Sequence, residues 1–149
     1  MMQNITNKYA PLFLRLALAA ALLSAVADRL GFWPEAASNW GNMERFTTYT
    51  AQITSFLPSG METANAWLAT LAETVLGLLL ILGFKTRWAA FGSGLLLLIF
   101  AVSMTLTVGV KTTFDYSVWV GSAAAFLLAG KEQFYFSLDQ LISQKSSTE

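Results

Sequence analysis

The chain has 149 residues, 12% of them charged and 55% hydrophobic, and its formal net charge is zero. Soluble domains have roughly 25% charged residues, so the composition indicates a membrane protein, and a chain without a positive excess is not expected to bind nucleic acid. The absence of Cys and His excludes thiol redox cycling, Cys/His zinc sites, Cys-ligated iron–sulfur clusters and His-ligated haem, so we expect no metal site and no intrinsic cofactor.

Four apolar segments are long enough to cross a membrane. A hydrocarbon core of about 30 Å needs about 20 helical residues at about 1.5 Å each. We expect spanning helices at residues 9–30, 62–84, 87–109 and 114–130. A soluble four-helix bundle is the alternative, but the runs Val75–Leu82 and Leu95–Ala101 leave no polar face for water. The predicted fold is all-α: a polytopic membrane protein with a bundle of four transmembrane helices in a single domain.

The first segment also has features of a cleavable signal peptide. Lys8 precedes an apolar stretch that ends in Ala25–Ala27, an A-x-A cleavage pattern. Arg15 interrupts that stretch, however, and this opposes cleavage. We therefore interpret the segment as the first spanning helix.

Residues 31–61 form a long loop that contains a helical pattern. Between Asn42 and Pro58, large apolar residues recur at spacings of three and four: Met43, Phe46, Tyr49, Ile53 and Phe56. This stripe predicts a short amphipathic helix that lies on the membrane or caps the bundle. The pattern leaves open whether the helix is a structural lid or gates the entry of a substrate.

Glu73 is a lone carboxylate inside the apolar run from Trp67 to Phe84. An acid near the middle of a bilayer costs about 3 kcal/mol on insertion scales, so such residues usually face a protein interior or a pathway. Two interpretations stay open from the residue alone, a structural polar contact between helices and a site for a ligand or a proton.

Arg15 is the predicted partner of Glu73. At about 1.5 Å per residue, Glu73 lies roughly 16 Å from either end of its helix and Arg15 roughly 10 Å inside Lys8, an offset that a long Arg side chain can bridge. The helix face of Glu73 also carries small and polar residues: Ala66, Thr70 and Gly77. The matching face of the first helix carries Arg15, Ala19, Leu22, Val26 and Arg29. We predict that Arg15, Glu73 and Thr70 form an intramembrane polar site.

A second group of charges lies at the outer ends of the predicted helices: Asp28, Arg29, Lys111 and Asp115, with Glu44 and Arg45 available from the loop. Asp115 stands where the fourth helix starts, and the helix dipole and free N–H groups favour a carboxylate there. A structural role is the preferred interpretation of this outer-rim cluster. The alternative is that these charges line the mouth of a pathway.

Small residues follow one side of each of the last two predicted helices. They are Ala90, Gly94, Ala101 and Thr105 in the third helix, and Ser117, Gly121 and Ala125 in the fourth. Small residues let helix backbones approach closely in a membrane. We predict packing seams there and assign them no chemistry.

The distribution of Lys and Arg predicts the orientation. With both termini inside, the inner ends hold Lys8, Lys85, Arg87, Lys131 and Lys145, and the outer loops hold Arg29, Arg45 and Lys111. Positive charge is retained on the cytoplasmic side of short loops, so both termini are predicted to be cytoplasmic. Residues 131–149 then form a cytoplasmic tail with an amphipathic stripe: Phe134, Leu138, Leu141 and Ile142.

Three stretches together resemble the DoxX family of small four-helix bacterial membrane proteins. They are Leu14–Leu16 in the first helix, Ala72–Glu73 followed by Gly77 in the second, and Leu82–Arg87 at the next turn. The similarity spans most of the chain except the long loop and the tail. Where many members have a Gly and a Lys near the end of the first helix, this chain reads Ala27–Leu30.

The resemblance implies a role beside oxidoreductases, because related members include a subunit of a thiosulfate:quinone oxidoreductase and others form complexes with oxidative-stress enzymes. We expect an accessory subunit of a respiratory or redox-linked complex in the bacterial inner membrane, rather than a self-sufficient enzyme. This subunit would bind an oxidoreductase partner and contact quinone through Arg15 and Glu73. The alternatives are a small-solute or proton-coupled transporter and a scaffold without chemistry of its own, and a homo-oligomer stays open.

Overall fold

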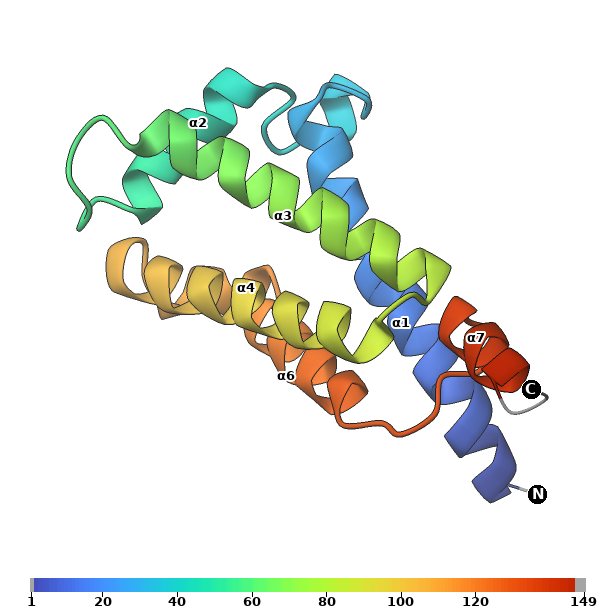
Figure 1. The fold of residues 1–149 in the computed structure, drawn as a ribbon. Coiled ribbons are helices and arrows are strands. Elements are labelled where there is room, and N and C mark those ends of the chain that lie inside the picture. Colours follow the sequence, from blue (N-terminus) through green and yellow to red (C-terminus); the bar gives the residue numbers. More distant parts are fainter. Residues whose placement is uncertain (1, 147–149) are drawn as a thin grey trace.

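Helices make up all the regular structure in residues 2–146, the part of the chain that the computed structural model describes. In chain order they are α1 (Met2–Arg29), the 3-10 turn η1 (Glu35–Ala37), α2 (Met43–Ile53), α3 (Glu62–Leu82), α4 (Thr86–Thr107), α5 (Val110–Asp115), α6 (Val118–Ala129) and α7 (Leu138–Ser146) (Figure 1). The predicted all-α fold is confirmed. The last three residues of the predicted tail lie outside the described part.

Within the described residues, three helices are long and apolar enough to cross a membrane: residues Lys8–Arg29 of α1, α3 and α4. The predicted fourth span, residues 114–130, is instead interrupted. α5 ends at Asp115, Ser117 has a left-handed conformation with φ of 54°, and α6 has only 12 residues. The indole N–H of Trp119 donates a hydrogen bond of 2.9 Å to the Thr113 hydroxyl across this break. A side-chain contact therefore ties together the two short helices that replace one long helix.

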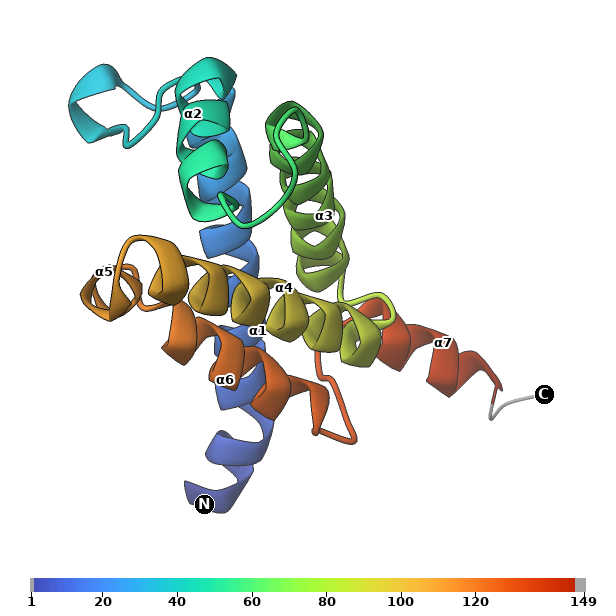
Figure 2. The ribbon, with the colours of Figure 1, turned by 90° about the vertical axis from the view of Figure 1, so that its left-hand side faces the viewer.

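Two helix pairs build the bundle, α1 with α3 and α4 with α6, and α3 also packs against α4 (Figure 2). Gly94 of α4 faces the ring of Phe126, which a β-carbon at Gly94 would approach to 2.9 Å. The Gly94 carbonyl accepts a hydrogen bond of 2.9 Å from the Ser122 hydroxyl. Ala90 and Ala125 are buried in the same core. The predicted seams are therefore confirmed as packing contacts at Ala90, Gly94 and Ala125, whereas Ser117 is exposed and lies before α6.

The predicted helix in the long loop is present as α2 and packs against α3 and α4. Asn42 caps it, because the side-chain oxygen of Asn42 accepts a hydrogen bond of 2.9 Å from the N–H of Arg45. Phe46 and Ile53 are buried, whereas Phe56 lies beyond the helix end and is exposed. α2 therefore caps the bundle, which is one of the two placements that its apolar stripe predicted.

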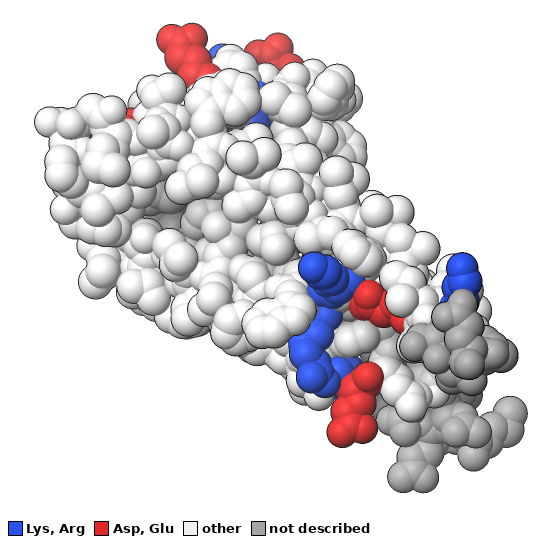
Figure 3. All heavy atoms as spheres, viewed as in Figure 1, with Lys and Arg blue, Asp and Glu red and all other residues white. Residues whose placement is uncertain are grey.

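Different segments cover the two ends of the bundle. At the α2 end, α2 packs beside the start of α3 and the end of α4. At the α7 end, α7 docks on the turn between α3 and α4, where the carboxylate of Asp139 accepts hydrogen bonds of 2.7 Å from the N–H groups of Lys85 and Thr86. Figure 3 shows charged side chains gathered at these two ends and an uncharged surface between them, which suits a protein surrounded by lipid.

Candidate functional site

A buried ion pair joins the end of α1 to the middle of α3. Arg29 and Glu73 are each only 3% exposed. Arg29 holds Glu73 through both terminal nitrogens, because Nη1 donates to Oε2 and Nη2 donates to Oε1 at 3.1 Å. Nη1 also donates to the Thr70 hydroxyl at 3.3 Å. This two-pronged contact satisfies both carboxylate oxygens and offsets part of the cost of burying two charges.

A close approach of α1 and α3 sets the register of the pair. The predicted face of α3 is confirmed, since its buried residues are Ala66, Thr70, Glu73, Gly77 and Leu80. Gly77 lies against Leu23 of α1, and a β-carbon at Gly77 would come within 2.7 Å of that side chain. The helices run antiparallel, so the contact between Leu23 and Gly77 brings Arg29 level with Glu73.

The predicted pair of Arg15 and Glu73 is wrong. Arg15 lies at the α7 end, buried beside Gly83, where its Nη2 donates a hydrogen bond of 2.7 Å to the Phe136 carbonyl. The prediction placed the N-terminal part of the first helix too deep relative to α3. Arg29 lies about four turns further along the same helix, and it takes the position that the prediction assigned to Arg15.

The residues of the predicted outer-rim cluster make separate contacts. Lys111 and Asp115 form an exposed ion pair on α5, with Nζ 2.7 Å from Oδ2. Arg29 pairs with Glu73 instead, and Asp28 binds the following loop. An exposed pair contributes at most about 1 kcal/mol, so Lys111 and Asp115 fit the structural interpretation.

Asp28 fixes the loop that carries Trp40. Its buried carboxylate accepts hydrogen bonds from the Ser38 hydroxyl and from the N–H groups of Asn39, Trp40 and Gly41, the last three at 3.0, 3.1 and 3.3 Å. Backbone N–H groups need a partner wherever water is excluded. One carboxylate therefore provides the partners for a turn that lies outside any helix.

Two aromatic rings cover the guanidinium of Arg29. Its central carbon lies 3.7 Å from the ring centroid of Phe46 and 5.4 Å from that of Trp40. The two rings meet edge to face, with their centroids 5.2 Å apart. Aromatic faces attract a cation, and the attraction grows when water is excluded. Phe46 on α2 and Trp40 in the loop held by Asp28 thus shield the ion pair.

A large cavity lies beside the ion pair. Its volume is about 1010 Å³, and its walls come from α1, α2 and α3 on one side and from α4 and α6 on the other. The lining is mostly apolar, and its charged members among the described residues are Asp28, Arg29 and Glu73. Two buried donors of lining residues have no acceptor within the described residues, Nε of Arg29 and Nδ2 of Asn65. The site combines apolar space, an ion pair and two donors with unused hydrogen-bonding capacity.

Sequence reasoning missed part of this site. It places Arg29 in the rim cluster, although Arg29 shares the helix face of Arg15 and was therefore a visible candidate for Glu73. No pattern in the sequence connects Trp40 or Asn65 with Glu73. Both residues enter the site through the fold of the loop and the start of α3.

Three long apolar helices, a buried ion pair between two of them and charges gathered at the ends define an integral, polytopic membrane protein in contact with lipid. Residues 10–109 of the 149 match the family model described as DoxX. The protein therefore belongs to the DoxX family. The matched range includes Arg29 and Glu73 and ends before α5. The comparisons with curated proteins and with solved structures found no match.

We expect Asp28→Asn to loosen residues 38–41 while the bundle stays folded. An uncharged amide with one acceptor oxygen holds the four donors less well, at a local cost of about 1 to 2 kcal/mol. Amide hydrogen exchange in nanodiscs should then be about tenfold faster at Asn39–Gly41. Glu44→Gln, which changes an exposed acid of α2, should leave that exchange unchanged. Equal exchange in both variants would contradict the role of Asp28.

Proposed function

We propose that this protein is the membrane subunit of a redox-linked complex and that its cavity binds a quinone beside Arg29 and Glu73. The sequence has no Cys or His with which to hold its own redox centre of the common kinds. In this proposal, the electrons pass between the quinone and an oxidoreductase partner. The resemblance to redox-linked DoxX relatives supports this role.

The observation that carries the proposal is the match between the cavity and an amphiphile with acceptor oxygens. At about 1010 Å³, the cavity has room for an apolar chain along its mostly apolar walls. Arg29 and Asn65 line this cavity, and their buried donors, Nε and Nδ2, have no acceptor among the described residues, so a ligand with acceptor oxygens would complement them once the covering side chains move aside. A ligand without acceptor atoms would leave both donors unsatisfied, so these donors favour a ligand that carries acceptor oxygens, as a quinone does.

Tyr49 adds a third donor to the cavity wall. Burial, together with the nearby Tyr116, raises the pKa of the Tyr49 phenol above its ordinary value. A phenol is protonated at neutral pH even without this shift, so Tyr49 can donate a hydrogen bond to an acceptor oxygen. Its ring also offers an aromatic face for a flat ligand.

Arg29 and Glu73 have different roles in this site. Arg29 donates through Nε toward an acceptor oxygen while its two terminal nitrogens hold Glu73. Glu73 is the carboxylate placed to hold or pass a proton at the cavity wall. A bound quinone supplies two-electron chemistry coupled to protons. Phe46 and Trp40 exclude water from the pair and so strengthen its electrostatic contacts.

Quenching of tryptophan fluorescence by decylubiquinone tests this proposal on the full chain in nanodiscs. Trp33 and Trp40 both line the cavity, so we expect saturable quenching that the double variant Trp33→Phe with Trp40→Phe largely removes. Asn65→Leu should weaken binding about fivefold, the effect of one lost hydrogen bond of about 1 kcal/mol.

Trp88→Phe is the matched control, because Trp88 lies outside the cavity lining and is exposed. It should leave the midpoint of the titration unchanged. Quenching that rises linearly without saturation, or an Asn65→Leu variant that binds as tightly as the unmodified protein, would show that the cavity does not hold the quinone in this way.

A further inference from the structure

The two ends of the molecule carry opposite excesses of charge, although the net charge of the chain is zero. Among the described residues, and leaving aside the buried Arg15, the α7 end holds five bases and two acids: Lys8, Lys85, Arg87, Lys131, Lys145, Glu132 and Asp139. The α2 end holds two bases and four acids outside the buried site: Arg45, Lys111, Glu35, Glu44, Glu62 and Asp115. The fold therefore concentrates positive charge around α7.

Three of the bases at the α7 end form no ion pair with any described residue: Lys85, Arg87 and Lys131. Arg87 donates through Nη2 to the Lys131 carbonyl at 3.2 Å, which brings the two residues together. Asp139 directs its carboxylate to the N–H groups of Lys85 and Thr86 rather than to a basic side chain. Lys85 and Arg87 are exposed, so their charges remain accessible.

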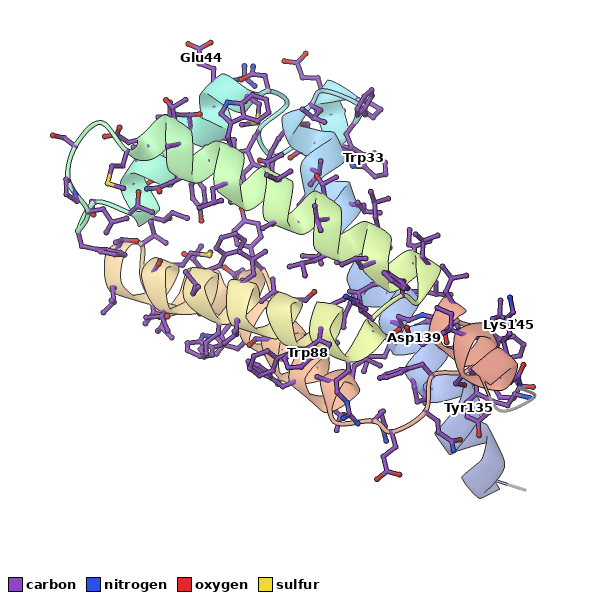
Figure 4. All side chains as sticks on the ribbon, in the orientation of Figure 1. Trp33, Glu44, Trp88, Tyr135, Asp139 and Lys145 are labelled. Atoms are coloured by element: carbon purple, nitrogen blue, oxygen red, sulfur yellow. The ribbon has the colours of Figure 1, made fainter. Side chains whose placement is uncertain are left out.

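Large apolar side chains border these bases. Trp88 follows Arg87 in the chain and is 71% exposed, and Leu141 and Ile142 of α7 are 62% and 56% exposed. Figure 4 shows Lys145 and Asp139 on α7 at this end, with Trp88 on the first turns of α4. Basic side chains next to exposed aromatic and aliphatic ones are typical of a surface at headgroup depth, where apolar groups enter the acyl region and bases reach phosphates.

We propose that the α7 end binds anionic phospholipids, with their phosphate groups held by Lys85, Arg87 and Lys131 and with α7 lying at headgroup depth. The guanidinium of Arg87 can hold two oxygens of one phosphate, while the two ammonium groups act as point charges. A zwitterionic headgroup carries its own cation, which competes for the same phosphate. The surface therefore prefers lipids with a net negative charge, which are abundant in the cytoplasmic leaflet that the predicted orientation places at this end.

Native mass spectrometry of the full chain in detergent tests this preference, with phosphatidylglycerol and phosphatidylcholine of matched acyl chains as probes. We expect at least about tenfold tighter binding of phosphatidylglycerol, since each base contributes about fivefold at an anionic surface. The triple variant Lys85→Gln, Arg87→Gln and Lys131→Gln should lose the preference. The matched control, Arg45→Gln with Lys111→Gln, removes bases from the α2 end and should keep it.

Equal binding of the two lipids to the unmodified protein would overturn the proposal, as would a preference that survives in the triple variant or is lost in the control. The unmodified protein offers a second test that does not depend on the folding of a variant. Its preference should weaken as the salt concentration rises, and a preference independent of salt would contradict binding through these charges. Inorganic phosphate at millimolar concentration should not displace phosphatidylglycerol, and full displacement would identify a free anion as the ligand.

Discussion

Replacing Glu73 with Leu is expected to destabilise the protein by about 3 to 5 kcal/mol, because Arg29 would remain buried without its partner. Arg29→Leu should have an effect of the same size. The two substitutions together should be close to neutral, since two apolar side chains of similar size then meet in place of the ions. Equilibrium unfolding in one detergent, followed by circular dichroism, measures the three free energies.

Arg15→Leu provides the control for this cycle. Arg15 contacts the Phe136 carbonyl at the α7 end, so its effect and that of Glu73→Leu should add. Additive effects of Arg29→Leu and Glu73→Leu would contradict the ion pair. Strong coupling of Arg15 with Glu73 would instead support the register that the sequence predicted.

Gly83→Ala is expected to cost about 3 kcal/mol. Gly83 ends α3 with φ of 64°, a conformation that costs other L-residues about 1 kcal/mol. A β-carbon there would meet the Arg15 guanidinium and come within 2.8 Å of the Ser137 Cα. Moving Arg15 breaks its hydrogen bond to the Phe136 carbonyl, and a hydrogen bond from a charged donor contributes about 2 kcal/mol.

Gly60→Ala separates the two causes in the same unfolding assay. Gly60 also has positive φ, at 97°, but no atom lies within 4 Å of a β-carbon built there. Gly60→Ala should therefore show only the backbone cost of about 1 kcal/mol. Equal costs at the two glycines would mean that Arg15 does not pack against Gly83.

The long helices follow from the sequence because hydropathy depends only on local composition. Residues 62–84 and 87–109 are predicted as spans, and α3 and α4 occupy Glu62–Leu82 and Thr86–Thr107. The break before α6, in contrast, could not be predicted from hydropathy. Residues 114–130 form an apolar run with small residues at helical spacing, and the left-handed conformation of Ser117 leaves no trace in that pattern.

The candidate site was likewise predictable only where it depends on local sequence pattern. The faces of α1 and α3 come from helical periodicity, so the sequence places Glu73 and Thr70 on one buried face correctly. The register of α1 against α3 depends on the contact of Leu23 with Gly77, which involves two distant segments. The role of Asp28 was also hidden, because three of its four donors are backbone N–H groups that any residue type supplies.

The ion pair between α1 and α3 has a consequence for the order of events during synthesis. Arg29 ends the apolar segment of α1, so its long side chain can reach the headgroups while α1 is the only helix in the membrane. Glu73 is synthesised 44 residues later and lies near the middle of α3. When α3 enters the bilayer, the cation that Glu73 needs is already there, and α2 can cover the pair once the two helices have docked. The earlier helix can tolerate its charge without a partner, and the later helix inserts next to a partner that is already in place.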